Sequence, residues 1–300
     1  MVDTLQAIST ALQVVCGAAI VSNVLAVVLF AATKQLRVKY YGFAFNLVLG
    51  DIAAPTFILL VKFRAYLQVP SVVSLSLFHT SLCAVELSIL AIAVNRLLAL
   101  TITPPARYDA MVTRGRMLAA CLLIWVISAA LYVPTTHINT PLVAYMLRPL
   151  ISLVILLITA VLYCTVFRQI ARYTPPLAST EGARADESVA RARLRQTRYL
   201  MITFAIILVT CFACWIPFCI ANFMNYVSGK IYSVQPQSLK VLYQLSLLLL
   251  MLNSLINPFI YWWRIREFRD GMYRWVCLVR GSADPENEVV TLQTMQEPEN

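Results

Sequence analysis

Three charged side chains lie inside stretches that are otherwise apolar, and they are the strongest candidates for chemistry in this sequence. Asp51, Glu86 and Arg96 are each flanked on both sides by runs rich in Leu, Ile, Val and Ala. A charge in such surroundings is costly, and it normally binds an ion, moves a proton or pairs with a polar neighbour. For Asp51 and for Glu86 two interpretations stay open: an ion or proton function, or a neutral carboxyl that is hydrogen-bonded to its neighbours.

A second polar group surrounds a proline near the end of the last apolar stretch. Pro258 would lie inside a helix, where it frees a backbone carbonyl and bends the chain, so that neighbouring polar groups must compensate. Pro217 would likewise lie inside a helix, in the preceding apolar stretch. The polar residues at the Pro258 kink are Asn253, Ser254 and Asn257.

The sequence lacks the patterns that catalysis requires. We find no nucleophile–base pair, no cluster of metal ligands and no glycine-rich phosphate loop. We therefore expect no enzyme activity, no metal centre and no catalytic cofactor.

The composition indicates what must position these side chains. Of the 300 residues, 60% are hydrophobic and 13% are charged, and the mean hydropathy is +0.75. Soluble domains carry about 25% charged residues, so lipid is the expected solvent. A helix needs about 20 apolar residues to cross a bilayer. Leu, Ala and Ile without strict alternation favour helices over barrel strands, so the predicted fold is all-α, an integral membrane seven-transmembrane-helix bundle. Its predicted helices span 8–32, 42–66, 72–100, 117–134, 146–170, 199–227 and 239–263.

The distribution of basic residues predicts the orientation. Most of the 24 lysines and arginines fall in the connections after odd-numbered helices and in the tail. Because positive loops stay in the cytoplasm, we expect residues 1–7 to be a short extracellular N-terminus. Residues 8–276 would be the membrane domain and 277–300 a cytoplasmic tail. The net charge of +10 is then a topology signal, and no nucleic acid partner is expected.

Several of these residues, in order along the chain, resemble the marker positions of rhodopsin-like (class A) G-protein-coupled receptors. The resemblance covers about residues 15–277. The short connection at 135–145 is similar to that of the melanocortin, lipid and cannabinoid receptor branch. The resemblance implies that residues 264–269 form a short amphipathic eighth helix. The matching residues outside the two proline kinks are Asn23, Leu47, Asp51, Arg96, Trp125 and Tyr163.

The resemblance implies a plasma-membrane receptor that signals through a heterotrimeric G protein, with arrestin as a further partner. Activation would move the cytoplasmic half of the sixth helix outward, and Arg96 would line the cleft that opens. The acidic residue that usually precedes this arginine is Asn95 here, and Thr197 replaces the acid that can pair with it from the sixth helix. We therefore expect signalling without ligand. The residues implied in coupling and activation are Asn95, Arg96, Tyr163, Trp215, Pro217, Pro258 and Tyr261.

The family also implies an ion site and a lipid anchor. In such receptors the aspartate equivalent to Asp51 binds a sodium ion, and no other cofactor is expected. The serine that commonly completes the site is Val85 here. Cys277 falls where a palmitoylated cysteine follows the eighth helix. The expected ion or proton group comprises Asp51, Glu86, Asn253, Ser254 and Asn257.

A small-molecule or lipid ligand is expected in the outer half of the bundle. Phe78 stands where amine receptors carry an aspartate, and Met251 stands where opsins carry the retinal-binding lysine. Biogenic amines and covalent retinal are therefore disfavoured, whereas the basic and aromatic residues of the outer half favour an anionic or amphipathic ligand. The candidate ligand-binding residues are Lys62, Phe78, His79, Leu82, Arg148, Trp215, Phe218, Asn222 and Tyr243.

One rival interpretation comes from a different functional class. A seven-helix transporter or proton-conducting protein could use Asp51 and Glu86 as a relay. Such a protein needs polar residues from one face of the membrane to the other. Between Glu86 and Arg96 the third helix offers only Ser88 and Asn95.

Overall fold

The computed structural model is almost entirely helical in its described residues, and none of these residues forms a strand. It describes residues 2–37, 41–63, 66, 70–102, 105–138, 140–172, 181–231 and 236–280.

Seven helices in this part of the chain are long and apolar enough to cross a membrane, in agreement with the predicted fold class. Shorter helical segments connect or follow them: η1 (Lys34–Arg37), α5 (Pro105–Met111), η3 (Val143–Leu147) and α10 (Arg266–Arg280). The seven long helices are α1 (Val2–Ala32), α2 (Gly42–Lys62), α4 (Ser71–Thr101), α6 (Arg114–Ile138), α7 (Arg148–Arg172), α8 (Glu181–Ile231) and α9 (Gln237–Arg264).

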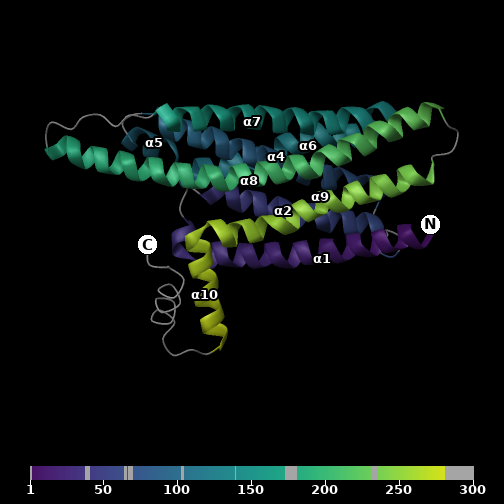
Figure 1. The fold of residues 1–300 in the computed structure, drawn as a ribbon, viewed down its shortest axis with the longest axis horizontal. Helices are drawn as coiled ribbons and strands as arrows, with labels where there is room; N and C mark the ends of the chain where they lie inside the picture. The colour runs from purple at the N-terminus through teal and green to yellow at the C-terminus, as the bar shows by residue number, and fades with distance from the viewer. Residues whose placement is uncertain are drawn as a thin grey trace.

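The long helices form one elongated bundle in which α4 is central. Helix α4 contacts α2, α6, α7 and α8, while α1 packs against α2 and α9. Figure 1 shows the N-terminus at one end of the bundle and α10 turning away from the bundle at the opposite end. We call these the N-terminal end and the α10 end. Large apolar side chains of α6, such as Leu118, Leu122 and Val126, are exposed on the outside, as expected of a surface that faces lipid.

Several boundaries differ from the predicted ones. Helix α2 ends at Lys62, four residues before the expected end. Helix α6 continues to Ile138, so the expected connection at 135–145 is largely helical. Helix α8 begins at Glu181, far ahead of residue 199. The eighth helix, α10, runs on to Arg280. The tail beyond residue 280 lies outside the described residues, as does the side chain of Cys277.

The kink in α9 is compensated by a side chain from α1. Pro258 has no N–H, so the carbonyl of Ser254 loses its normal helical donor. Asn23, fully buried, donates from Nδ2 to this carbonyl at 2.9 Å, and also to the carbonyl of Ala19 at 2.9 Å. Asn23, a marker residue of the predicted first helix, therefore joins α1 to α9 at the point where α9 lacks a backbone hydrogen bond.

An aromatic cluster holds α10 at its end of the bundle. Tyr261 and Phe268 pack against Phe30, with ring centroids 6.0 and 5.6 Å from it. Tyr41, just before α2, donates a hydrogen bond to Glu267 Oε2 at 3.3 Å. Burial and the nearby Glu267 carboxylate raise the pKa of Tyr41 above its ordinary value, so this phenol stays a donor.

Candidate ligand-binding and signalling sites

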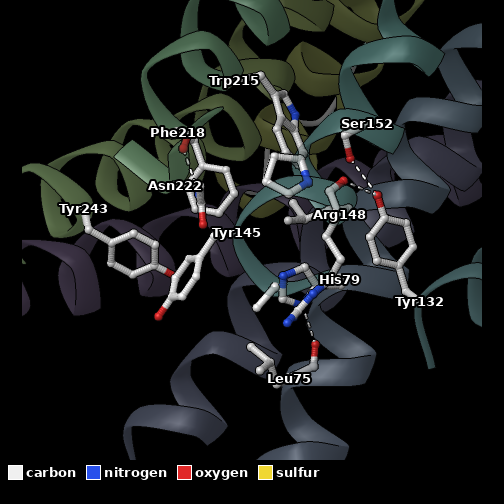
Figure 2. Close-up of a pocket in the computed structure, with 13 residues that line it drawn as sticks. Leu75, His79, Tyr132, Tyr145, Arg148, Ser152, Trp215, Phe218, Asn222 and Tyr243 are labelled. Atoms are coloured by element: carbon white, nitrogen blue, oxygen red, sulfur yellow. Dashed lines mark hydrogen bonds between the residues drawn. The ribbon is translucent and has the colours of Figure 1, made fainter. Parts of the chain in front are cut away.

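A cavity of about 250 Å³ opens between α4, α6, α7, α8 and α9 in the half of the bundle nearer the N-terminal end. We call it the main cavity, and Figure 2 shows the side chains that line it. They are Leu75, His79, Leu82, Tyr132, Ala144, Tyr145, Arg148, Pro149, Ser152, Trp215, Phe218, Asn222 and Tyr243.

A π-helical turn, Val143–Leu147, contributes to this lining. The N–H of Arg148 donates to the carbonyl of Val143, five residues earlier, so the chain is wider here than in an α-helix. Tyr145 lies inside this turn and Arg148 lies directly after it. Both side chains consequently reach the main cavity.

The charged side of the cavity is built around Arg148, which is buried at 4% exposure. Its guanidinium interacts electrostatically with the imidazole of His79 on α4, and Figure 2 shows the two side chains together. The His79 ring stacks on Tyr132 of α6, with centroids 5.9 Å apart. Tyr132 donates its hydroxyl to the carbonyl of Arg148 at 3.2 Å and lies 2.8 Å from Ser152 Oγ. Tyr132 therefore holds Arg148 through its backbone carbonyl.

The opposite wall is aromatic. Trp215 and Phe218 of α8 meet edge to face at 5.5 Å, and Phe218 lies 5.9 Å from Tyr243 of α9. Asn222 donates to the carbonyl of Phe218 at 2.7 Å, which leaves its amide oxygen for the cavity. An aromatic wall opposite a buried cation suits a ligand with one anionic and one apolar face.

Seven of the nine residues expected to bind ligand line the main cavity, and two do not. Phe78 is buried next to His79, with ring centroids 5.2 Å apart, but it does not line the cavity. Lys62 lines a separate cavity. The sequence reasoning missed Tyr132, Ser152 and Tyr145, because no pattern in the sequence distinguishes them from other buried or loop residues.

The expected ion site assembles in part around Asp51, which is fully buried. Asp51 Oδ2 accepts a hydrogen bond of 2.6 Å from Asn257, and Ser254 is its other polar neighbour. Asn253 instead donates to the thiol of Cys211 at 3.4 Å. Within the described residues, one side-chain oxygen each of Asp51, Asn253 and Asn257 lacks a hydrogen-bond partner. Such oxygens are ligands that a hard cation accepts.

Glu86 lies apart from this group, below the floor of the main cavity. It is 1% exposed, and its neighbours include Ser152, Tyr132 and the thiols of Cys83, Cys211 and Cys219. Neither carboxyl oxygen completes a hydrogen bond of ordinary geometry within the described part of the chain. The residue two helical turns before it on α4 is His79, so one face of α4 leads from the cavity to this carboxyl.

Arg96 lies in the half of α4 nearer the α10 end and is 2% exposed. Its charge interacts with the buried phenol of Tyr163 on α7. Asn95 accepts a hydrogen bond of 2.9 Å from Tyr108 of α5, so its amide is engaged by the connection that follows α4. Tyr261 lies further along in the aromatic cluster at α10. The side chain of Thr197, expected to face Arg96, lies outside the described residues.

Comparison with known proteins assigns this architecture to a family. A sequence model described as "7 transmembrane receptor (rhodopsin family)" matches residues 22–145 and 139–261. Melanocortin receptor 5 of Sus scrofa is 28% identical over 272 residues, which cover 83% of this chain and 85% of the relative. Adenosine receptor A3 of Ovis aries is 26% identical over 280 residues, 84% of each chain. Sphingosine 1-phosphate receptor 5 of Homo sapiens is 29% identical over 219 residues, 67% of this chain and 53% of that receptor.

These relatives are receptors and not enzymes, and they agree with the seven apolar helices and with the marker residues along them. The chain belongs to the rhodopsin family of seven-transmembrane receptors, and it is a multi-pass, cell-surface G-protein-coupled receptor.

Proposed function

We propose that this receptor is activated by an anionic small molecule that enters from outside the cell and places its acidic group against Arg148. One observation carries the proposal. The guanidinium of Arg148 is buried at the main cavity, and no carboxylate among the described residues lines that cavity. A charge-assisted hydrogen bond in such a cavity contributes about 1.5–3 kcal/mol. The Trp215 and Phe218 rings receive the apolar part of the ligand.

The signal passes through α8. Trp215 forms part of the cavity wall and lies two residues before Pro217, where the helix lacks one backbone hydrogen bond. A ligand that shifts the indole biases the bend at this proline, and the half of α8 nearer the α10 end moves outward. This movement opens a cleft beside Arg96 and Tyr163, into which a heterotrimeric G protein inserts.

Charge supports this orientation. The α10 end carries the larger share of exposed basic side chains among the described residues, and basic termini belong in the cytoplasm. The N-terminal end therefore faces the extracellular side, and the α10 end faces the G protein, arrestin and anionic membrane lipids. The exposed basic residues at the α10 end include Lys34, Arg114, Arg116, Arg168, Arg172 and Arg198.

We also propose that Asp51 holds a sodium ion in the resting state. Asp51 and Asn257, joined by a hydrogen bond of 2.6 Å, each keep a buried oxygen without a partner, and Asn253 of the same helix as Asn257 offers a third; such hard oxygen donors suit this ion. The apolar Val85 stands where a hydroxyl ligand is common in the family, so the ion is held by fewer side chains. Sodium would stabilise the packing of α2 against α9.

The polar residues of α4 support a receptor over a proton-conducting protein. Ser88, between Glu86 and Arg96, donates to the carbonyl of Ala84 at 2.6 Å and accepts from Asn46 at 2.8 Å. Asn95 is engaged by Tyr108. Both polar side chains hydrogen-bond to a residue of a neighbouring helix, so they stabilise the bundle and do not line a proton path.

A ligand screen with a second-messenger readout tests the proposal. Compounds that carry a carboxylate, sulfate or phosphate are expected to include agonists, and Arg148→Gln should weaken them by about tenfold to a hundredfold. Arg168→Gln, which changes an exposed arginine at the α10 end, is the matched control for ligand binding, and it is compared by ligand-induced thermal stabilisation because this end faces the G protein. Cationic agonists, or anionic agonists indifferent to Arg148→Gln, would overturn the proposed ligand chemistry.

A further inference from the structure

A second cavity, of about 420 Å³, lies beside the main cavity at the N-terminal end of the bundle. We call it the lysine cavity. Residues from α1, α2, α8 and α9 contribute to it, together with one residue of the π-helical turn. Its lining residues are Leu5, Ser9, Lys62, Tyr145, Asn225, Lys240, Tyr243 and Gln244.

Two ammonium groups from different helices border this cavity. Lys62, half-buried at the end of α2, points its Nζ to Gln244 Oε1 at 3.5 Å. Lys240 follows from the first turn of α9. Among the described residues, none that lines this cavity carries a negative charge, so the two amines raise the local potential for an anion.

Two tyrosines connect the lysine cavity to the main cavity. Tyr145 and Tyr243 line both of them, and Figure 2 shows the two rings on the same side of the main cavity. Arg148 lies near both phenols. The positive charges of the two cavities therefore lie on either side of one pair of rings.

The lining also restricts what the ligand can be. Most side chains around the main cavity have a polar atom, and so do seven of the eight described side chains around the lysine cavity. A long acyl chain would leave many of these groups without water and without hydrogen-bond partners, which is costly. A compact molecule with polar groups at both ends satisfies them.

We infer that the ligand carries two acidic groups, one held by Arg148 in the main cavity and the other by Lys62 and Lys240 in the lysine cavity. This inference rests on the proposed function for the first acidic group and adds the second. The connecting part of the ligand passes between Tyr145 and Tyr243. Two anchors on one molecule act together, because the second group binds at a high effective concentration once the first is in place.

Two series of simple acids test the inference. The probes are the α,ω-alkanedicarboxylates from succinate to sebacate and the monocarboxylates of equal length. Their affinities are measured by thermal stabilisation of the purified full-length receptor in lipid nanodiscs. One length of dicarboxylate is expected to bind the wild type at least about tenfold more tightly than its matched monocarboxylate. Arg168→Gln again serves as the control.

The variants separate the two proposals. Lys62→Gln with Lys240→Gln should bring the dicarboxylate down to the affinity of the monocarboxylate, while Arg148→Gln should weaken both series. An advantage of the dicarboxylate that survives the double lysine change would overturn the second subsite and leave Arg148 in place. Monocarboxylate binding that is insensitive to Arg148→Gln would instead overturn the proposed function. If no member of either series binds, both are wrong.

Discussion

Replacing Asn23 by alanine should destabilise the receptor mainly through the carbonyl that Pro258 leaves without a donor. Asn23 is fully buried, and its amide donates to Ser254 O at 2.9 Å. Alanine removes the donor and leaves a buried carbonyl unsatisfied, which costs about 1–3 kcal/mol in general. Side-chain hydrogen bonds between membrane helices average about 0.6 and reach about 1.7 kcal/mol. We therefore expect a loss of about 1–2 kcal/mol in the free energy of unfolding.

A double-mutant cycle isolates this contribution. In a Pro258→Ala background, the alanine N–H can donate to Ser254 O, so that Asn23→Ala leaves no orphaned carbonyl. The volume lost at Asn23 is the same in both backgrounds and cancels. We expect a coupling of about 1 kcal/mol, with Asn23→Ala costing less when Pro258 is absent.

The cycle is measured by equilibrium unfolding of purified receptor in mixed micelles with increasing SDS. Ser22→Ala is the matched control, because the Ser22 hydroxyl donates only within α1, to Ala19 O at 3.1 Å. Equal costs of Asn23→Ala in the two backgrounds would refute the explanation. The link between α1 and α9 would then be packing alone.

Three further predictions concern packing, basal signalling and proton sensitivity. Gly50→Ala should cost about 1–3 kcal/mol of stability, because the new Cβ would meet Val85 Cγ2 at 2.6 Å. Gly17→Ala is the control and should be neutral or stabilising, since a Cβ there has nothing within 4 Å. Equal melting temperatures of the two variants would contradict this prediction. Asn95→Asp should lower ligand-free signalling by about tenfold or more, since a charge-assisted restraint on the neighbouring arginine contributes about 1.5–3 kcal/mol; unchanged basal second-messenger levels at matched surface expression would refute it. If the Glu86 carboxyl is neutral at rest and ionises on activation, signalling falls as the pH falls; Glu86→Gln, an uncharged amide of the same shape, should fold normally and flatten that response, and superimposable pH curves would reduce Glu86 to a core carboxyl.

The sequence predicted the seven helices because their signal is strong and local. Each is a long apolar stretch, and lipid leaves the backbone no alternative to a helix. Boundaries differ from the predicted ones where polar sequence continues a helix. Helix α8 extends back to Glu181 because 181–198 is rich in Ala and Arg, which are good helix formers outside the membrane.

The sequence predicts which residues belong to the candidate site better than it predicts how their side chains pack against one another. Arg148, His79 and the aromatic residues of α8 follow from their places along apolar helices. The stacking of His79 on Tyr132 depends on how α4 packs against α6, which a single sequence does not encode visibly. Lys62 was grouped with Arg148 because both lie at outer helix ends, and the structure places them in separate cavities.

The most direct test of the central claim is nucleotide exchange on purified heterotrimeric G proteins by the receptor reconstituted in nanodiscs. Because Asn95 supplies no carboxylate beside Arg96, the wild type should accelerate exchange without any ligand, and Arg96→Ala should abolish the acceleration at equal receptor concentration. Absence of exchange across representatives of every G-protein class, or an Arg96→Ala variant as active as the wild type, would contradict the account.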